Sequence, residues 1–405
     1  MGSTTDDLLE AGQNALLKGK VDIDKIKNHH IQVCNDLKTP FNDLEPLFDE
    51  LDNLLNGIAL LKELSKQSLD CLVSFGERLS VRVISSFFNS SGIKSKFYDG
   101  WDAGFITNSN FVDAEILDET YQNIENNLSS LKDNYEYTPI VTGFIAKDKD
   151  CKITTLGRGG SDLTAAILGS ALHVEEIQVW KDVDGILSTD PRMVDQAYPV
   201  PRVSFEEAAE LAYFGAKVLH PLSIKPAMER NIPVRVKNSY KPEHPGTIIV
   251  KDTEHTNSLV KAITCKRNIT VVDIYSSRML GQYGFLNRVF QIFNNHKISV
   301  DMVATSEVSV SLTLNDASNL HEAIPELEEI AKVSISKGKS ILSLISDISR
   351  SSEILRKTFK TLKELGTNVQ MISQGASRVN ISLVINDEEI DEAVKALHSN
   401  FFSGE

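Results

Sequence analysis

The last third of the chain repeats itself, and this repeat restricts the possible folds more than any other feature. Three pairs of identical residues are separated by the same 69 positions: Phe290 and Phe359, Val300 and Val369, and Met302 and Met371. In the first copy, strand, helix, strand and strand are predicted at Val271–Ile274, Leu286–His296, Val300–Thr305 and Val308–Leu314. Because repeats usually are stacked copies of one supersecondary unit, we expect two small α+β modules packed sheet edge to sheet edge.

Composition and charge restrict the function. With 405 residues, 41% of them hydrophobic and 24% charged, the chain is predicted to form two or three globular domains. Its net charge of −14 argues against a general nucleic-acid binder, but a local basic pocket can still bind small anions. No apolar run approaches the roughly 18–20 residues of a membrane span, and the histidines and four scattered cysteines lack metal-site spacing. We therefore expect a soluble protein with reduced thiols and no metal site of its own.

Hydrophobic periodicity predicts an α/β architecture for the first two thirds. Residues 7–89 are predicted to be mainly helical, because leucines recur there at helical spacing. Further elements are expected as follows: strands at Thr138–Ile145, Lys152–Leu156, Glu176–Trp180 and Ile232–Val236, a helix at Asp162–His173, and a helix opened by the capping box Ser204–Glu207. This alternation favours a largely parallel sheet. The stretch Ser239–Thr256, rich in Pro, Gly and charge, is predicted to be a domain linker.

A glycine-rich turn between a strand and a helix, Thr154–Thr164, is the first candidate ligand site. Its glycines allow a ligand to approach the backbone closely, and the N–H groups at the helix start favour an anion. Arg158 adds a planar donor fork suited to a carboxylate or phosphate, and Asp162 is placed as N-cap or as partner of a ligand amine. The alternative is a plain turn in which Asp162 is an ordinary helix cap.

The segment Trp180–Arg192 is the second candidate, because it follows a predicted strand at the sheet edge where α/β proteins bind ligands. There Asp182 is placed to accept a ribose hydroxyl or to order the loop, and Arg192 is placed to reach a phosphate. The alternative is a long polar loop that contains an Asp-Pro turn.

Two further motifs place charges at unusual positions. In Phe214–Pro221, Lys217 can act as a point charge for phosphates, although a helix C-cap with a dipole-complementing lysine explains this motif better by itself. In Ser74–Ser80, Glu77 interrupts an apolar helix and can hold a substrate ammonium. The alternative is that Glu77 pairs with Arg78 or lies on the helix surface.

Taken in this order, the motifs resemble those of aspartate kinase. Gly157–Asp162, Asp182–Arg192 and Phe214–Pro221 each match a motif of that family, and the repeat looks like its paired ACT modules. The residues around Glu77 and over Asp99–Phe105 are most similar to the plant monofunctional, lysine-sensitive type. The resemblance covers essentially the whole chain. It implies an amino-acid-kinase three-layer sandwich with a mainly parallel sheet over residues 1–238, a linker over 239–258, and ACT modules over 259–332 and 333–405.

The resemblance implies ATP-dependent phosphorylation of L-aspartate to 4-phospho-L-aspartate, the first step towards lysine, threonine, methionine and isoleucine. Mg²⁺ would enter with the nucleotide, and no protein ligand is assigned to it. The chain is expected to form a homodimer or larger assembly through its ACT modules, with lysine as effector and without a nucleic-acid or membrane partner. A plastid location is implied by the resemblance alone, because the sequence shows no transit segment.

The resemblance also implies individual site residues. Those expected to bind aspartate are Thr5, Glu77, Phe144, Arg158, Ser161 and Asp162, and those expected to serve the nucleotide are Lys181, Asp182, Arg192 and Lys217. Glu77 would hold the aspartate amino group, Arg158 would bind its carboxylate, and Asp162 would order the loop. Together Arg158, Asp162 and Lys217 would form the catalytic set. The family often has an aromatic ring where Leu187 stands, so stacking on adenine is not expected there.

For the effector, the resemblance implies a lysine site at a dimer interface between ACT modules. The residues expected there are Met279, Gln282, Gly284, Phe285, Leu286, Ser299, Val300, Asp301, Thr305 and Ser306. Asp301 would pair with the side-chain ammonium of lysine, and N–H groups at a helix start would bind its carboxylate. The alternative is that Asp301 is only a charge at a sheet edge. Gln370 replaces this aspartate in the second copy, which is not expected to bind lysine in the same way.

One departure from the family concerns the start of the chain. The family opens with Lys-Phe-Gly-Gly-Ser-Ser, which cradles ATP, and this motif is absent from the sequence. Removing one preorganised donor typically costs ~10²–10³-fold in rate. We therefore expect a truncated product with little or no kinase activity by itself. The alternative function is that of a lysine-binding regulatory polypeptide with a catalytically dead kinase half; another amino-acid kinase is disfavoured by the Arg158 turn and the paired modules.

Overall fold

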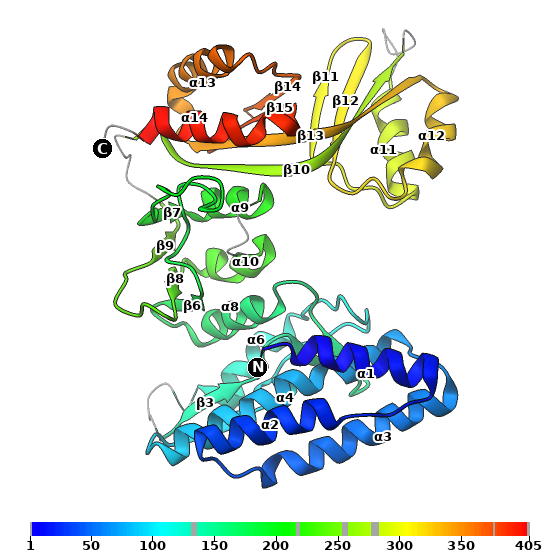
Figure 1. Ribbon diagram of the computed structural model, residues 1–405, viewed down its shortest axis with the longest axis vertical. Coiled ribbons are helices and arrows are strands. Elements are labelled where there is room, and N and C mark those ends of the chain that lie inside the picture. The colour runs from blue at the N-terminus through cyan, green and yellow to red at the C-terminus, as the bar shows by residue number, and fades with distance from the viewer. Residues whose placement is uncertain are drawn as a thin grey trace. The chain divides into compact units, whose positions relative to one another are not determined.

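The computed structural model describes residues 2–129, 131, 136–215, 219–252, 258–276, 283–375 and 377–402. The chain divides into two compact units, Met1–Val179 with Leu222–Val234 and Trp180–Pro221 with Arg235–Glu405. The elements are labelled in Figure 1. Among the described residues, no helix has the length and apolarity that crossing a bilayer requires.

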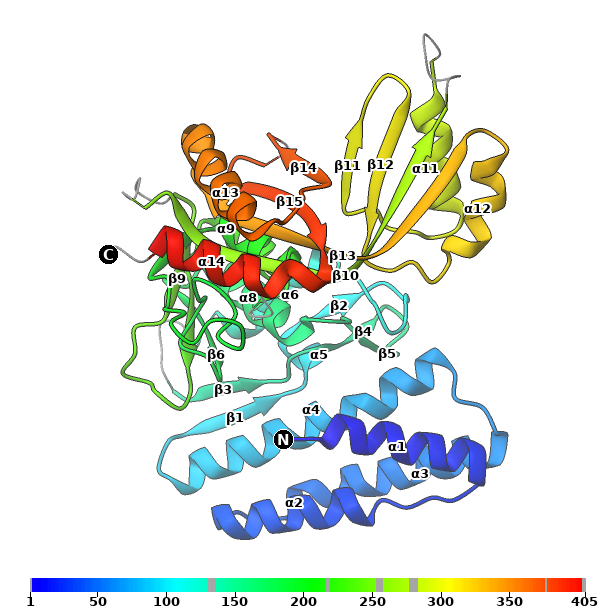
Figure 2. The same ribbon diagram turned by 45° about the horizontal axis from the view of Figure 1, so that its top comes forward.

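The first unit begins with four helices, as the leucine spacing predicts. They are α1 (Thr4–Lys18), α2 (Asp24–Leu37), α3 (Glu45–Leu61) and α4 (Lys66–Ser90), with a short 3₁₀ turn at Asn42–Leu44. Leu8, Leu51 and Phe75 are fully buried in the core that they share. The Ser65 side chain caps α4 by accepting a hydrogen bond from the backbone N–H of Ser68, 3.1 Å away. These helices form one bundle, seen from a second direction in Figure 2.

The strands of the first unit pack against α4 and against three later helices, which confirms the layered α/β class. They are β1 (Ser95–Tyr98), β2 (Ile106–Thr107), β3 (Thr138–Val141), β4 (Ile145–Asp148) and β5 (Ile153–Thr155). The helices are α5 (Gly100–Ala103), α6 (Glu119–Leu128) and α8 (Gly160–Leu172). The pairs β1–β3 and β2–β4 are parallel, and β4–β5 is an antiparallel hairpin. Ile124 of α6, Ala146 of β4 and Ile167 of α8 share one buried core.

One strand prediction needs correction, because Thr138–Ile145 is two strands. The break falls at Gly143–Phe144, where Phe144 has φ 67°. A left-handed residue cannot continue a β-strand, so the chain turns there. Phe144 in this turn is one of the residues expected to bind aspartate.

The second unit begins with a small sheet whose strand order is β6-β8-β9-β7, and the boundary between the units passes through β6 and β8. The strands are β6 (Ile177–Lys181), β7 (Arg202–Ser204), β8 (Val234–Asn238) and β9 (Thr247–Val250), and the helix that follows β7 is α9 (Phe205–Tyr213). The helix α10 (Pro221–Arg230) belongs, apart from its first residue, to the first unit. The predicted capping box opens α9: the Ser204 hydroxyl accepts from the Glu207 N–H, and the Glu207 carboxylate accepts from the Ser204 N–H. The predicted linker 239–258 is corrected in part, because β9 lies inside it and pairs in parallel with β7.

The repeat forms one six-stranded sheet in the order β11-β12-β10-β13-β15-β14. Its strands are β10 (Val260–Tyr275), β11 (Met302–Thr305), β12 (Ser309–Leu314), β13 (Lys332–Ser346), β14 (Met371–Gln374) and β15 (Asn380–Asn386). Its helices are α11 (Phe285–Asn295), α12 (Leu320–Glu328), α13 (Ser351–Leu365) and α14 (Ile390–Phe402), with 3₁₀ turns at Ile348–Arg350 and Asp387–Glu389. The predicted edge-to-edge packing is confirmed, because the two copies meet where β10 pairs with β13 (Figure 2).

The two copies exchange strand halves. The first half of β10 pairs with the second half of β13, for example Ile263 with Leu344, and both residues lie in the core under α13 and α14. The second half of β10 pairs with the first half of β13, for example Ile274 with Val333, in the core under α11 and α12. The ranges 259–332 and 333–405 predicted from the sequence therefore do not coincide with the two cores.

Candidate functional site

The glycine-rich turn in the first unit projects Arg158 towards solvent. Gly157 and Gly159 have φ of 67° and 73°, and Gly159 is the N-cap of α8. This left-handed backbone favours glycine at position 157, where a Cβ would also lie 2.6 Å from Oδ1 of Asp113. Arg158 is exposed between the two glycines. Asp162 lies in the first turn of α8 and is not the N-cap, so its interpretation as an ordinary cap is wrong.

The Phe144 turn packs directly against this glycine-rich turn. The backbone N–H of Leu156 donates to the carbonyl oxygen of Phe144 at 2.9 Å. A Cβ on Gly160 would lie 2.9 Å from the Phe144 ring, and a Cβ on Gly143 would lie 2.9 Å from the Ser161 hydroxyl oxygen. The structure therefore brings Phe144 and Ser161 together with the Arg158 turn, as the resemblance predicts.

Glu77 lies on α4 and is half-buried. Its carboxylate makes no hydrogen bond or ion pair with any residue that the structure describes, and burial raises its pKa. Arg78 is instead paired with Glu50, through bonds of 2.7 and 2.9 Å, so the alternative Glu77–Arg78 pair is wrong. The Thr5 hydroxyl oxygen of α1 lies 3.7 Å from where a Cβ on Gly76 would be, beside Glu77. A half-buried carboxylate without a partner is suited to bind a ligand ammonium.

Asp70 is a site residue that the sequence did not reveal. It precedes Glu77 by seven residues, or about two turns, and so lies on the same face of α4. Its buried carboxylate accepts from the Val112 N–H at 2.9 Å, the Thr155 N–H at 3.1 Å and the Thr155 hydroxyl at 2.8 Å. Burial raises the pKa of Asp70, and the three hydrogen bonds oppose that rise. Asp70 thus fixes the end of β5, from which the glycine-rich turn starts.

The second unit contains a cavity of about 450 Å³ at the end of β6. Lys181, Asp182 and Arg192 line it, so the structure brings three of the four predicted nucleotide residues together. The fourth, Lys217, lies outside the described residues. Leu187 also lines the cavity and gives it an apolar surface in place of an aromatic ring. β9 supports this cavity, because the Thr247 hydroxyl accepts from the Ile186 N–H at 2.8 Å.

The predicted Asp-Pro turn is also present in this loop. Arg192 folds back onto Asp190, with its Nη2 2.6 Å from Asp190 Oδ2 and its Nε 3.0 Å from Oδ1. The Arg192 hydrogen bonds hold the pKa of Asp190 below its usual value. The Arg192 side chain remains largely exposed although it is paired with Asp190.

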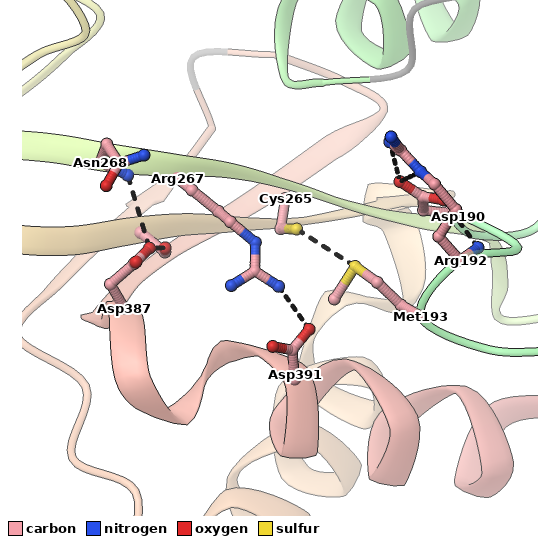
Figure 3. A network of polar contacts seen from close by, with 9 residues as sticks. Asp190, Arg192, Met193, Cys265, Arg267, Asn268, Asp387 and Asp391 are labelled. Atoms are coloured by element: carbon pink, nitrogen blue, oxygen red, sulfur yellow. Dashed lines mark hydrogen bonds and ion pairs between the residues drawn. The ribbon is translucent and has the colours of Figure 1, made fainter.

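One wall of the cavity comes from the repeat, which the sequence did not reveal. Ile263, Thr264 and Cys265 of β10 line the same space as Asp182 and Arg192. Figure 3 shows Cys265 directed to Met193, with the two sulfur atoms 3.7 Å apart, and Arg267 paired with Asp391 of α14. The first strand of the repeat is therefore part of the candidate nucleotide site.

The predicted effector residues surround the start of α11 and of β11. Gly284, with φ 84°, is the N-cap of α11, and Phe285 and Leu286 begin that helix. Exposed residues next to β11 or at its end are Ser299, Thr305 and Ser306, and Val300 is partly buried. Met279 and Gln282 lie outside the described residues.

Asp301 is not merely a charge at the sheet edge. Only 4% of its side chain is exposed, and its Oδ1 accepts from the Tyr213 hydroxyl at 2.6 Å and from Lys266 Nζ at 3.2 Å. Gln370 occupies the matching place in the second copy, since its N–H bonds Val384 as that of Asp301 bonds Thr313. Within the described ranges, no group of three or more His, Cys, Asp or Glu side chains is arranged to hold a metal ion.

Comparison with known proteins gives a family. A model described as Amino acid kinase family matches residues 2–238, and one described as ACT domain matches residues 343–401. Aspartokinase 3, chloroplastic, of Arabidopsis thaliana is 49% identical over 99% of this chain and 75% of its own length. The lysine-sensitive aspartokinase 3 of Escherichia coli K12 is 35% identical over 94% of this chain and 86% of its own.

Crystal structures agree with the sequence comparison. E. coli aspartokinase III in complex with aspartate and ADP (R-state) has a TM-score of 0.83 and 33% identity, covering 99% of this chain and 91% of that chain. The same enzyme in complex with lysine and aspartate (T-state) has a TM-score of 0.77 and 32% identity, with the same coverage. The chain therefore belongs to the aspartokinase family, with an amino acid kinase domain followed by ACT modules.

Proposed function

We propose that this chain transfers the terminal phosphoryl group of ATP to the side-chain carboxylate of L-aspartate and forms 4-phospho-L-aspartate. The observation that carries this proposal is the turn around Arg158. Two left-handed glycines present its guanidinium at the start of α8, where backbone N–H groups also favour an anion. The family membership of the chain supports the same reaction.

The aspartate would be bound by both of its charges. Glu77 would hold its ammonium, because this carboxylate has no partner among the described residues. Arg158 with Ser161 would bind the α-carboxylate, while Phe144 walls the pocket and Asp162 orders the turn. Thr5 would contact the substrate from α1. No general base is required, because the attacking carboxylate is already ionised at neutral pH.

The nucleotide would occupy the cavity at the end of β6. Asp182 would accept hydrogen bonds from the ribose hydroxyls. The positive charges of Lys181, Arg192 and Lys217 would balance the negative charge of the phosphates. Mg²⁺ would enter as part of the nucleotide substrate and would offset the charge of its phosphates. The chemistry is mainly one of positioning, since a carboxylate and a triphosphate are both anions and repel each other unless cationic groups separate them.

Lysine would regulate the reaction through the first ACT module. The start of α11 offers N–H groups for a carboxylate, and Asp301 offers a buried negative charge for an ammonium. We propose that the ACT modules also join two or more chains. The chloroplastic location of the Arabidopsis relatives favours a plastid for this chain as well.

A coupled assay of ADP release tests the reaction. Because the sequence lacks the Lys-Phe-Gly-Gly-Ser-Ser motif, we expect slow ADP release that still depends on aspartate. Arg158→Ala should lower this rate by ~10²–10³-fold, the usual cost of one preorganised donor. Asn110→Ala, which changes an exposed loop residue, serves as the control. ADP release that does not depend on aspartate, or that Arg158→Ala leaves unchanged, would overturn the proposal. Lysine binding without nucleotide binding would instead favour a regulatory polypeptide.

A further inference from the structure

A small charged cluster joins three elements of the second unit. The Asp301 carboxylate, just before β11, receives the Tyr213 hydroxyl from the end of α9 and Lys266 Nζ from β10, both on Oδ1. Lys266 Nζ also lies 4.5 Å from the centre of the Tyr213 ring. Asp301 Oδ2 is buried and has no hydrogen-bond partner in the described part of the chain. The single negative charge of Asp301 is thus already neutralised by Lys266, although Oδ2 remains without a donor.

Asp301 also borders a cavity. Asp301 and Tyr213 line a cavity of about 530 Å³ between α9 and the sheet, together with Glu210, Ser373 and Asn380. Its described lining contains two carboxylates and neither lysine nor arginine. A cavity with this lining favours an ammonium ligand over an anion.

Both partners of Asp301 are neighbours in sequence of residues that line the nucleotide cavity. Lys266 follows Cys265, which lines that cavity, and Tyr213 lies between Leu211 and Gly215, which line it too. The walls touch, because the Thr264 hydroxyl donates to the Phe214 carbonyl at 3.0 Å. A Cβ on Gly215 would lie 2.3 Å from the Cys265 carbonyl oxygen, so there is no space for a side chain at position 215.

Lys266 lies where the regular pairing of the first half of β10 ends. The register between β10 and β13 shifts between Lys266 and Ile269, and Asn268 has φ 59°. Beyond Lys266 the ladder is thus locally disrupted. Arg267 and Asn268 face Asp391 and Asp387 just beyond it (Figure 3).

We propose that the side-chain ammonium of the effector competes with Lys266 for Asp301, so that Lys266 is a built-in mimic of the ligand. This inference rests on the lysine regulation proposed above. One carboxylate cannot neutralise two ammonium groups, and like charges a few ångströms apart repel each other. Effector binding therefore weakens the contacts of Lys266 and Tyr213. It loosens β10 and α9 together, and with them the walls of the nucleotide cavity.

Calorimetry on the full chain tests the competition by titrating lysine with and without saturating ADP. For the wild type we expect lysine to bind more weakly in the presence of ADP. Lys266→Met should bind lysine roughly 5- to 150-fold more tightly, the usual range of coupling between sites, and ADP should no longer weaken that binding. Lys266→Arg, which keeps the charge, should behave like the wild type. Lys332→Met, which removes an exposed lysine at the other end of the β10–β13 pair, is the matched control.

A second variant and a second measurement separate an effect on lysine binding from a loss of folding. Tyr213→Phe removes one hydroxyl and should weaken the antagonism between lysine and ADP while lysine still binds. In Lys266→Met, added lysine should raise the melting temperature more than in the wild type, because the free ammonium replaces the missing side chain. If lysine binds the wild type and binds Lys266→Met with the same affinity, the proposed competition between lysine and Lys266 is wrong. The proposed regulation by lysine is not affected by that result. If lysine does not bind the wild type, the proposed lysine regulation fails and the competition fails with it.

Discussion

At the scale of single residues, α4 contrasts two carboxylates that lie on the same face. Asp70 accepts three hydrogen bonds, whereas Glu77 accepts none from the described residues. A buried carboxylate with three donors is stabilised by the fold, and one without donors is stabilised only when a ligand supplies them. The first residue therefore builds the site, and the second is available to bind the substrate.

Glu77→Gln should weaken aspartate binding and stabilise the ligand-free protein. The lost charge-assisted contact is worth about 1.5–3 kcal/mol, so aspartate affinity should fall by roughly 10- to 100-fold. Because burial raises the pKa of Glu77 in the folded state, its negative charge opposes folding at pH values above that pKa. The stability gained by the variant should therefore be largest at neutral pH and vanish as the pH falls below the ordinary pKa of glutamate.

Calorimetry and thermal melts at several pH values check both halves of this prediction. Glu119→Gln, which neutralises an exposed carboxylate of α6, is the control for a general charge effect. A variant that loses stability at neutral pH while keeping its aspartate affinity would show that Glu77 supports the fold instead of binding the substrate.

Asp70→Ala and Asp70→Asn should differ sharply. Alanine leaves the buried N–H group of Thr155 without an acceptor, at about 1–3 kcal/mol, and frees the part-buried N–H group of Val112 at a smaller cost. Asparagine keeps one acceptor oxygen for both N–H groups, and its amide can donate to the Thr155 hydroxyl, so the loss should stay below about 1 kcal/mol. Denaturant unfolding measures the difference. Equal losses would show that the charge of Asp70, and not its hydrogen bonds, holds β5.

At the scale of elements, the sequence predicts the features that depend only on residues close together in the chain. The capping box of α9 and the turn around Arg158 are set by neighbouring residues, and both are found. The break at Phe144 is missed, because its left-handed backbone is held by contacts with Gly160 and Leu156 in a later segment. The anchoring role of Asp70 is missed for the same reason, since its donors are 42 and 85 residues away.

The contact between α14 and the cavity loop should make stability depend on pH. Buried His398 Nε2 lies 2.9 Å from the Ser188 hydroxyl oxygen, which in turn accepts from the Tyr198 N–H. Burial of the imidazole in this contact favours neutral His398 over its charged form. Burial lowers the pKa of His398, so this stability is present above the ordinary histidine pKa and is lost as the pH falls through the lowered value.

Melting curves between about pH 7 and pH 5 check this expectation, because unperturbed histidine titrates there. The wild type should lose melting temperature over that range, and His398→Gln should lose less of it. His321→Gln, which changes an exposed histidine of α12, should keep the slope of the wild type. A slope that His398→Gln leaves unchanged would assign the pH dependence to other groups.

At the scale of the whole molecule, the main feature is that the ACT modules are interleaved. The sequence predicts both copies, because each follows the same pattern of elements, but it does not show which strand half belongs to which core. That choice depends on pairing between residues about 80 positions apart, such as Ile263 with Leu344. It also explains how one strand, β10, both completes the second module and lines the nucleotide cavity.

Fragments of the repeat provide the test of this interleaving. A fragment of residues 258–402 should unfold in one cooperative transition, because each half of β10 keeps its partner. A fragment of residues 259–332 should not fold stably: it loses the β13 partner of Ile274 and exposes Val260 and Ile263, each worth about 1.5–3 kcal/mol when buried. A fragment of residues 268–338, although similar in length, keeps β11, β12 and the paired halves of β10 and β13, and should fold. Circular dichroism with thermal melting compares the three. If residues 259–332 melt as cooperatively and at as high a temperature as residues 268–338, the modules are consecutive along the chain, and β10 does not couple the second module to the nucleotide cavity.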